Sequence, residues 1–181
     1  MSKYLRVGFV LVCIVIIVVA VALWQDLHSF VFAWVLNFTL MFGVLYATET
    51  FKPKLASTYY KSKKWEAGGR IYKWFGVDVF RKLLVWVGWE KLNKASNPVN
   101  KNLDALKQLE YRTRQSEIGH LIIFFIVLIF NLVVAFKYGI IQSLWLFFLN
   151  IMLNVYPIVV QRYNRPRLKN IINRSKETMG T

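Results

Sequence analysis

Residues 7–24 read VGFVLVCIVIIVVAVALW, a run of eighteen residues without a charged side chain. A helix rises about 1.5 Å per residue, so a run of this length crosses most of the roughly 30 Å of hydrocarbon in a bilayer. The run follows Lys3 and Arg6 but lacks a small-x-small cleavage site before a polar chain. We therefore expect a retained membrane helix and not a cleaved signal peptide.

Three further stretches are nearly free of charge over a similar length, at 28–48, 118–136 and 140–160. Very short connections at 25–27 and 137–139 join the first stretch to the second and the third to the fourth. The pattern predicts an all-α integral membrane protein with four transmembrane helices in two hairpins.

The charge is strongly basic and unevenly distributed. The chain has 24 Lys and Arg against 9 Asp and Glu, a net charge of +15, although 56% of its residues are hydrophobic. Long apolar segments interrupt the charge, which argues against a nucleic-acid-binding protein. Fifteen of the basic residues lie in 49–117 and six in the tail after Gln161, whereas the 25–27 turn has none. Because cytoplasmic loops carry such an excess, we expect both termini and the central segment to be cytoplasmic.

The sequence thus divides into a first hairpin at 1–50, a cytoplasmic or interfacial helical segment at 51–116, and a second hairpin with a basic tail at 117–181. Residues 69–91 read GRIYKWFGVDVFRKLLVWVGWEK, in which aromatic and basic residues alternate in a stretch too short to span. This mixture suits the headgroup region, so we expect interfacial helices broken near Gly76. A small soluble helical cap is the alternative.

Pro98 and its polar neighbours predict a turn at 95–100. We expect a new polar helix to begin near Asn102, and it can run directly into the third span.

The third span carries Glu117, His120 and Asn131 on one helical face, and the fourth carries a matching polar stripe. The residues of the second stripe are Ser143, Asn150, Asn154 and Gln161. Two facing stripes predict an internal polar seam. For Asn131 and Asn150 the simpler interpretation is hydrogen bonding between helices.

The depth of each residue predicts that Glu117 and His120 meet Gln161 and Arg162 near the cytoplasmic surface. Pro157 is expected to bend the fourth helix there and to free a backbone carbonyl.

A metal site is not expected. A Glu-x-x-His pair occurs in di-iron bundles, but those need a second such pair, and the other histidine, His28, is predicted on the opposite membrane face. Cys13 is the single cysteine, so no intramolecular disulfide can form.

The fourth span ends in the basic string QRYNRPRL at 161–168. Its three arginines are Arg162, Arg165 and Arg167. They are either anchors at the cytoplasmic interface or ligands of a phosphate group, which guanidinium binds in bidentate fashion.

Residues 157–168, PIVVQRYNRPRL, closely resemble the end of the glycosyl-4,4'-diaponeurosporenoate acyltransferases, bacterial membrane enzymes of staphyloxanthin-type carotenoid synthesis. Two further matches follow the same order. They are Trp65-Glu66 followed by Gly69 and Trp74, and the string TRQSE at 113–117 followed by His120. The resemblance covers about residues 60–174.

This resemblance implies a bacterial cell-membrane enzyme that moves a fatty acyl group from acyl-CoA or an acyl carrier protein to a sugar hydroxyl of a glycolipid such as a carotenoid glucoside. His120 would be the general base, and Glu117 would orient it. No cofactor is expected besides the acyl donor, and no nucleic acid partner. The expected substrate-binding residues are Glu66, Asn154, Gln161, Arg162, Asn164, Arg165 and Arg167, with the arginines on the donor and the amides on the tetrahedral oxyanion.

Two other classes of function remain open from the sequence. One is a noncatalytic partner subunit that binds anionic lipid through its basic segment. The other is a small transporter, which would show internal repetition of its hairpins, and no such repeat is visible.

Overall fold

The structure is a computed structural model and describes residues 2–88 and 102–179. Within these ranges the chain is helical and contains no strand. Four helices are long and apolar enough to cross a membrane: Lys3–Trp24, Phe30–Phe51, Leu103–Tyr138 and Ile141–Glu177. The all-α class and the four apolar helices are thus confirmed, whereas the two hairpins and the interfacial placement stay predictions.

The chain forms two compact units. The first consists of Met1–Lys54 and Ile118–Pro157, and the second of Leu55–Glu117 and Ile158–Thr181. The boundaries fall inside two helices, α5 (Leu103–Tyr138) and α7 (Tyr156–Met179), so each of these helices contributes residues to both units.

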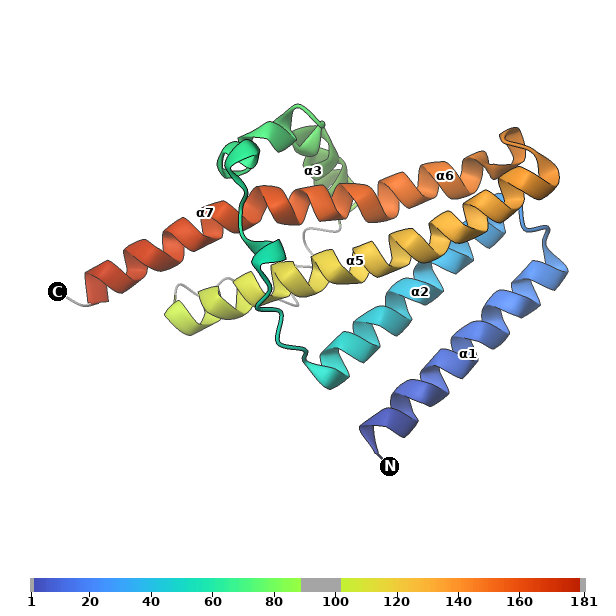
Figure 1. Cartoon of the computed structure of the whole chain (residues 1–181), viewed down its shortest axis with the longest axis horizontal. Helices are drawn as coiled ribbons and strands as arrows, with labels where there is room; N and C mark the ends of the chain where they lie inside the picture. The colour runs from blue at the N-terminus through green and yellow to red at the C-terminus, as the bar shows by residue number, and fades with distance from the viewer. Residues whose placement is uncertain (1, 89–101, 180–181) are drawn as a thin grey trace. The chain divides into compact units, whose positions relative to one another are not determined.

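The first unit contains α1 (Lys3–Trp24), α2 (Phe30–Phe51), the apolar part of α5, and α6 (Leu144–Asn150), as Figure 1 shows. Ser2 and Ser29 begin α1 and α2, because their hydroxyls accept the backbone N–H three residues later. Its buried core comes from α2, α5 and α6 and consists of Phe32, Ala33, Leu36, Ile123, Val127, Val134, Leu146 and Leu149.

A glycine allows α1 and α2 to approach closely. Gly43 of α2 is buried, and a β-carbon there would collide with the side chain of Ile14 on α1. Close approach of this kind is typical of small residues between membrane helices.

The chain after α6 passes through a π-helical turn, η4 (Ile151–Val155), before α7 begins. Pro157 follows this turn, and proline neither donates to nor fits against the carbonyl four residues earlier, that of Leu153. A π-turn widens the helix and relieves this conflict, while the bend and the freed carbonyl predicted at Pro157 stay predictions.

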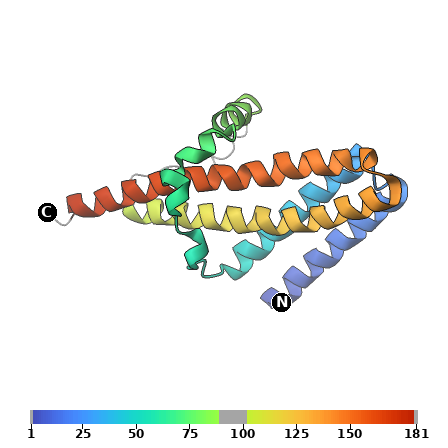
Figure 2. The same cartoon turned by 45° about the horizontal axis from the view of Figure 1, so that its top comes forward.

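The second unit contains the polar start of α5, most of α7 and three short helical pieces, η1 (Thr58–Tyr60), η2 (Lys64–Lys73) and α3 (Val77–Trp86) (Figure 2). Leu106 of α5 packs with Leu168 and Ile172 of α7 in its core. Gly76 has φ 71° just before α3, so the predicted break at this glycine is confirmed. The predicted helix from near Asn102 into the third span is also confirmed, because α5 begins at Leu103, whereas the turn predicted at 95–100 lies outside the described residues.

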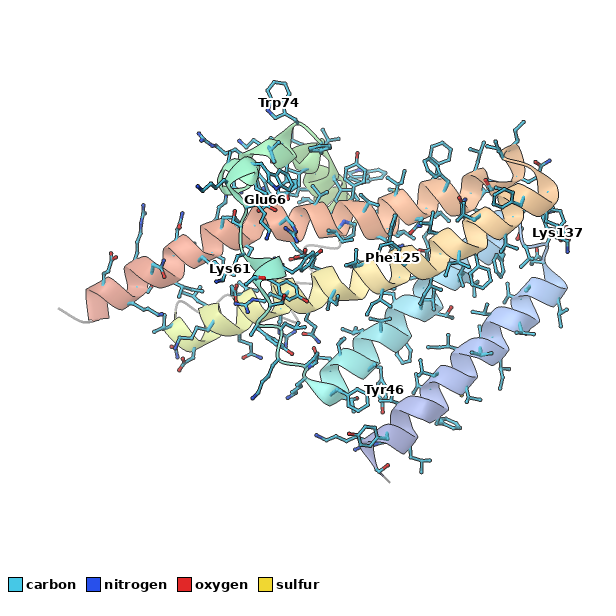
Figure 3. The ribbon with its side chains drawn as sticks, viewed as in Figure 1. Tyr46, Lys61, Glu66, Trp74, Phe125 and Lys137 are labelled. Atoms are coloured by element: carbon cyan, nitrogen blue, oxygen red, sulfur yellow. The ribbon has the colours of Figure 1, made fainter. Side chains whose placement is uncertain are left out.

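Two tryptophans, one directly after η2 and one at the end of α3, have exposed side chains. Trp74 is 91% exposed and projects away from its unit (Figure 3), and Trp86 is 83% exposed. Basic residues lie beside them in sequence, at Arg70, Lys73 and Lys82. This surface has the composition of a membrane interface, and its placement there stays a prediction.

Candidate functional site

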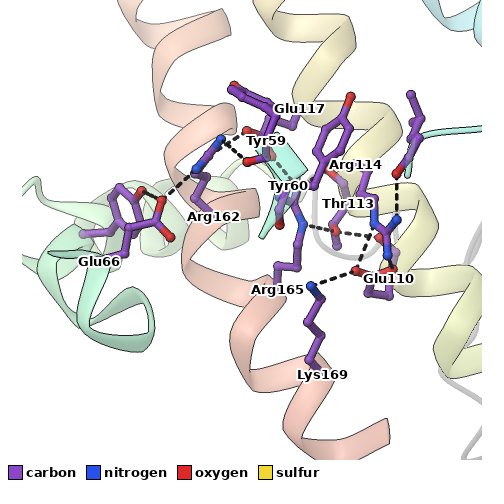
Figure 4. Close-up of polar contacts among 12 residues, drawn as sticks. Tyr59, Tyr60, Glu66, Glu110, Thr113, Arg114, Glu117, Arg162, Arg165 and Lys169 are labelled. Carbon is purple, nitrogen blue, oxygen red and sulfur yellow. Dashed lines mark hydrogen bonds and ion pairs between the residues drawn. The ribbon is translucent and has the colours of Figure 1, made fainter. Parts of the chain in front are cut away.

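Two buried carboxylates and two arginines form a closed cluster in the second unit (Figure 4). We call Glu66, Glu117, Arg162 and Arg165 the ion-pair cluster. Arg162 joins the two carboxylates, since its Nε donates to Glu117 Oε1 at 2.7 Å and its Nη1 to Glu66 Oε1 at 2.7 Å. Arg165 Nη2 donates to the other oxygen of Glu117, which is 0% exposed. The predicted meeting of Glu117 with Arg162 is therefore confirmed.

A left-handed turn places Glu66 in the cluster. The three residues after it, Ala67, Gly68 and Gly69, have φ of 48°, 66° and 89°. At Gly69 a β-carbon would lie 3.0 Å from the carbonyl oxygen of Tyr163 in α7. Only glycine therefore fits where the turn touches α7, and this contact brings Glu66 to Arg162.

Glu66 is held as a carboxylate by several donors. The Lys63 N–H donates to Oε2 at 2.9 Å and the Tyr72 hydroxyl to Oε1 at 2.9 Å. Burial by itself raises the pKa of Glu66, but the hydrogen bonds from Lys63, Arg162, Tyr72 and Ser62 outweigh it, so the pKa lies below its ordinary value. Burial and the bond to Glu66 raise the pKa of the Tyr72 hydroxyl, which therefore stays protonated and donates.

Arg165 is the most enclosed cation of the cluster, at 3% exposed. Its Nε donates to Thr113 Oγ1 at 3.0 Å and its Nη2 to the Thr113 carbonyl at 3.0 Å. The guanidinium also lies over the Tyr60 ring, 5.4 Å from its centroid. These contacts link α5, α7 and η1 to one another.

The remaining predicted residues of the string at 161–168 lie along α7. Arg167 covers the Tyr163 ring at 3.6 Å and donates to the Tyr163 carbonyl, while Gln161 and Asn164 are half-buried. The roles predicted for these side chains, in donor or oxyanion binding, stay predictions.

An apolar hollow of about 420 Å³ adjoins the ion-pair cluster within the second unit. Its volume is within the range of ordinary small-molecule sites. Its walls are mainly aromatic and aliphatic, with two basic side chains among them. The lining residues are Tyr59, Lys63, Trp65, Tyr72, Ile158, Val159 and Arg162.

His120 belongs to the first unit, where the π-turn supplies its partner. Its Nδ1 lies 3.4 Å from Asn154 Oδ1. The orienting role predicted for Glu117 stays a prediction, and the side chain that holds the imidazole in this unit is Asn154.

Buried amides continue from Asn154 to other helices. Its Nδ2 donates to Asn37 Oδ1 at 2.7 Å and to Asn150 Oδ1 at 2.9 Å. Asn150 in turn donates to the Phe124 carbonyl at 3.1 Å, and Asn131 donates to the Ser143 carbonyl at 2.8 Å. Hydrogen bonding between helices, the simpler interpretation of Asn131 and Asn150, is confirmed.

Asn37 and Thr113 are among the members of these networks that sequence reasoning missed. Asn37 is the one buried amide of α2, and a lone Asn inside an otherwise apolar span was a signal that could have marked it. Thr113 gave no comparable signal, because a threonine in a polar helix has many ordinary explanations. Among the described residues, no three His, Cys, Asp or Glu side chains lie close enough to hold a metal ion.

A model of the glycosyl-4,4'-diaponeurosporenoate acyltransferase family matches residues 56–174, more than half of the chain. The chain therefore belongs to this family. No curated protein and no solved structure shows a significant match to it.

Proposed function

We propose that this member of the acyltransferase family transfers a fatty acyl group from a thioester donor to a sugar hydroxyl of a glycolipid such as a carotenoid glucoside. The family match carries the proposal, because residues 56–174 include the Glu66 turn, the α5 segment with Glu117 and His120, and the basic string of α7. The four apolar helices agree with a lipid acceptor.

His120 is the proposed general base. The hydroxyl oxygen of the acceptor sugar attacks the thioester carbonyl carbon while the imidazole takes the hydroxyl proton. A carbon–oxygen bond forms, the carbon–sulfur bond breaks, and the proton passes to the departing thiolate. Gln161 and Asn164, half-buried amides of α7, are the proposed donors to the tetrahedral oxyanion.

The apolar hollow is the proposed site of the aliphatic acyl chain. Ile158 and Val159 give it an aliphatic wall, and Trp65 and Tyr72 an aromatic one. Lys63 lines the same hollow, so its ammonium can meet a phosphate of coenzyme A or of a carrier protein's prosthetic group.

The ion-pair cluster is proposed to hold η1 and η2 in place beside α7. Its two carboxylates and two guanidiniums cancel in charge, so it offers little net attraction to a phosphate. Arg162 and Arg165 therefore serve as a scaffold for η1 and η2 in this proposal, and donor phosphates are assigned to Lys63.

Purified protein in nanodiscs tests the proposal directly. The wild type should acylate a carotenoid glucoside or a related glycolipid with acyl-CoA or acyl carrier protein, as followed by mass spectrometry of the product. Replacing His120 with Ala should lower turnover roughly 10²-fold or more, because a positioned base contributes that much. Replacing His28, the other histidine, is the matched control and should leave turnover intact.

Absence of transfer by the wild type with either donor would favour a noncatalytic subunit. Near-normal turnover in folded His120→Ala, judged by size-exclusion chromatography, would remove the base role.

A further inference from the structure

We propose that Asn154, itself oriented by Asn37 and Asn150, is a positioning residue that fixes His120 as the tautomer with its proton on Nδ1. The catalytic consequence rests on the proposed function of His120 as base. The tautomer itself is a property of the folded protein and can be measured without substrate.

At the two ends of the amide network, backbone carbonyls fix the orientation of the Asn37 and Asn150 side chains. Asn37 Nδ2 donates to the Ala33 carbonyl at 2.8 Å, and Asn150 Nδ2 donates to the Phe124 carbonyl at 3.1 Å. A carbonyl can only accept, so in both residues the NH₂ group must face the backbone. Each amide oxygen therefore faces Asn154.

Asn154 then has one orientation that satisfies both neighbours. Its NH₂ group carries two hydrogens, and it donates one to Asn37 Oδ1 at 2.7 Å and one to Asn150 Oδ1 at 2.9 Å. The flipped amide would set oxygen against oxygen at both contacts, in a residue that is buried. Asn154 therefore presents its oxygen to the His120 ring.

An oxygen at 3.4 Å from Nδ1 can hydrogen-bond only to a protonated nitrogen. In the neutral ring the proton is therefore on Nδ1, and the lone pair is on Nε2. This lone pair is the atom that would accept the proton of the acceptor hydroxyl. The inference also assigns a role to Asn37, which lies in α2, outside the part of the chain that the family model matches.

The decisive measurement is the ¹⁵N NMR spectrum of histidine-labelled protein in nanodiscs. A His28→Gln background leaves His120 as the single histidine. At a pH where the ring is neutral, Nδ1 should resonate as a protonated nitrogen and Nε2 as an unprotonated one. The opposite assignment in the otherwise unchanged protein would overturn the inference, whatever the activity.

Asn154→Leu, which keeps the size but removes the oxygen, should lower the fraction of the ring that carries its proton on Nδ1, because the acceptor of that proton is gone. Asn37→Leu should shift it in the same direction but less far, because Asn150 Oδ1 is then the one contact that still orients the Asn154 amide. Asn131→Leu is the matched control, since its amide bonds to the Ser143 carbonyl and is not part of the His120 network. A spectrum that Asn154→Leu leaves unchanged would also overturn the inference.

Turnover separates this inference from the proposed function. Asn154→Leu should reduce turnover roughly 10²-fold, close to the effect of His120→Ala, since the base then presents the wrong nitrogen. If folded His120→Ala keeps its turnover while the tautomer is Nδ1-protonated, the proposed base role fails and the positioning by Asn154 stands. If His120→Ala is inactive but Asn154→Leu keeps normal turnover, positioning by Asn154 is overturned and the base role stands.

Discussion

At the scale of single residues, the second unit depends on carboxylates that stay charged while buried. Glu66 is 2% exposed and accepts from an arginine, a tyrosine and a backbone N–H. Such a group stabilises the fold only while its partners match its charge, because an unpaired buried charge is costly. Stability should therefore depend on pH through this residue.

The lowered pKa of Glu66 in the folded protein decides in which direction stability changes with pH. The contribution of Glu66 to the free energy of unfolding is fully present above the pKa of about 4.3 that it has in the unfolded chain. This contribution is lost as the pH falls through the lower pKa that Glu66 has in the folded protein. We expect Glu66→Gln to lower the free energy of unfolding by roughly 1–3 kcal/mol at pH 7. The gap in melting temperature between wild type and variant should narrow as the pH falls below about 4.

Thermal unfolding in detergent between pH 7 and pH 3 measures this gap. Asp104→Asn is a suitable control, because that carboxylate is exposed and pairs only with the exposed Lys107 among the described contacts. A gap for Glu66→Gln that is constant over the whole pH range would show that the charge of Glu66 is not what stabilises the unit.

Contacts between single residues could be predicted from the sequence where both residues lie on regular helices. The spacing of Glu117 and Arg162 along two helices was enough to predict their contact. Glu66 was found only through the family resemblance, because its position depends on a turn with three left-handed residues, which include Ala67. A positive φ at an alanine results from tertiary contact and leaves no mark in the local sequence.

At the scale of elements, the turn between Glu66 and Arg70 decides how η2 meets α7. Gly68 and Gly69 share a left-handed backbone, but they differ in surroundings. A β-carbon on Gly68 would meet nothing within 4 Å, whereas one on Gly69 would meet the Tyr163 backbone. Alanine substitutions at these two glycines therefore distinguish the cost of backbone strain from the cost of a collision with α7.

We expect Gly68→Ala to cost about 1 kcal/mol, the price of a left-handed non-glycine residue. Gly69→Ala should cost clearly more, because the Tyr163 carbonyl and Cα must also move. Thermal melting of the two variants beside the wild type measures the difference. Equal losses would show that η2 does not need this approach to α7.

The proposed binding of the acyl chain in the hollow beside η2 can be tested by filling the hollow. Val159→Trp places a large ring on the α7 wall of the hollow and should raise the KM for long-chain acyl donors several-fold, with a smaller effect on short chains. Val133→Trp, at an exposed position on α5, is the matched control. The same KM for long donors in both variants would place the acyl chain elsewhere.

The helices themselves were the most predictable elements. Runs of apolar residues located all four long helices, because a membrane helix needs length and apolarity and little else. Their ends were less predictable. The start of α5 at Leu103 was predicted, but the continuation of α7 to Met179 was not, because it depends on apolar residues within a polar stretch, Leu168 and Ile172, which pack against Leu106 in the second unit.

At the scale of the whole molecule, charge and aromatic residues both indicate how the chain meets a membrane. The 49–117 segment and the tail carry 15 and 6 of the 24 basic residues, whereas the 137–139 turn carries one. Exposed tryptophans at 74 and 86 belong to the same basic segment. Its predicted position is therefore at the anionic cytoplasmic leaflet, which attracts Lys and Arg.

Cysteine labelling in intact cells tests this topology. Cys13→Ala removes the single native thiol. In that background we expect Tyr138→Cys, next to the short turn at 137–139, to react with an impermeant thiol reagent from outside. Ser62→Cys is also exposed in the structure but should react only after the cells are permeabilised, because the positive-inside rule places its segment in the cytoplasm. Labelling of Ser62→Cys in intact cells, with Tyr138→Cys protected, would invert the topology and place the proposed donor site on the side that lacks cytoplasmic acyl thioesters.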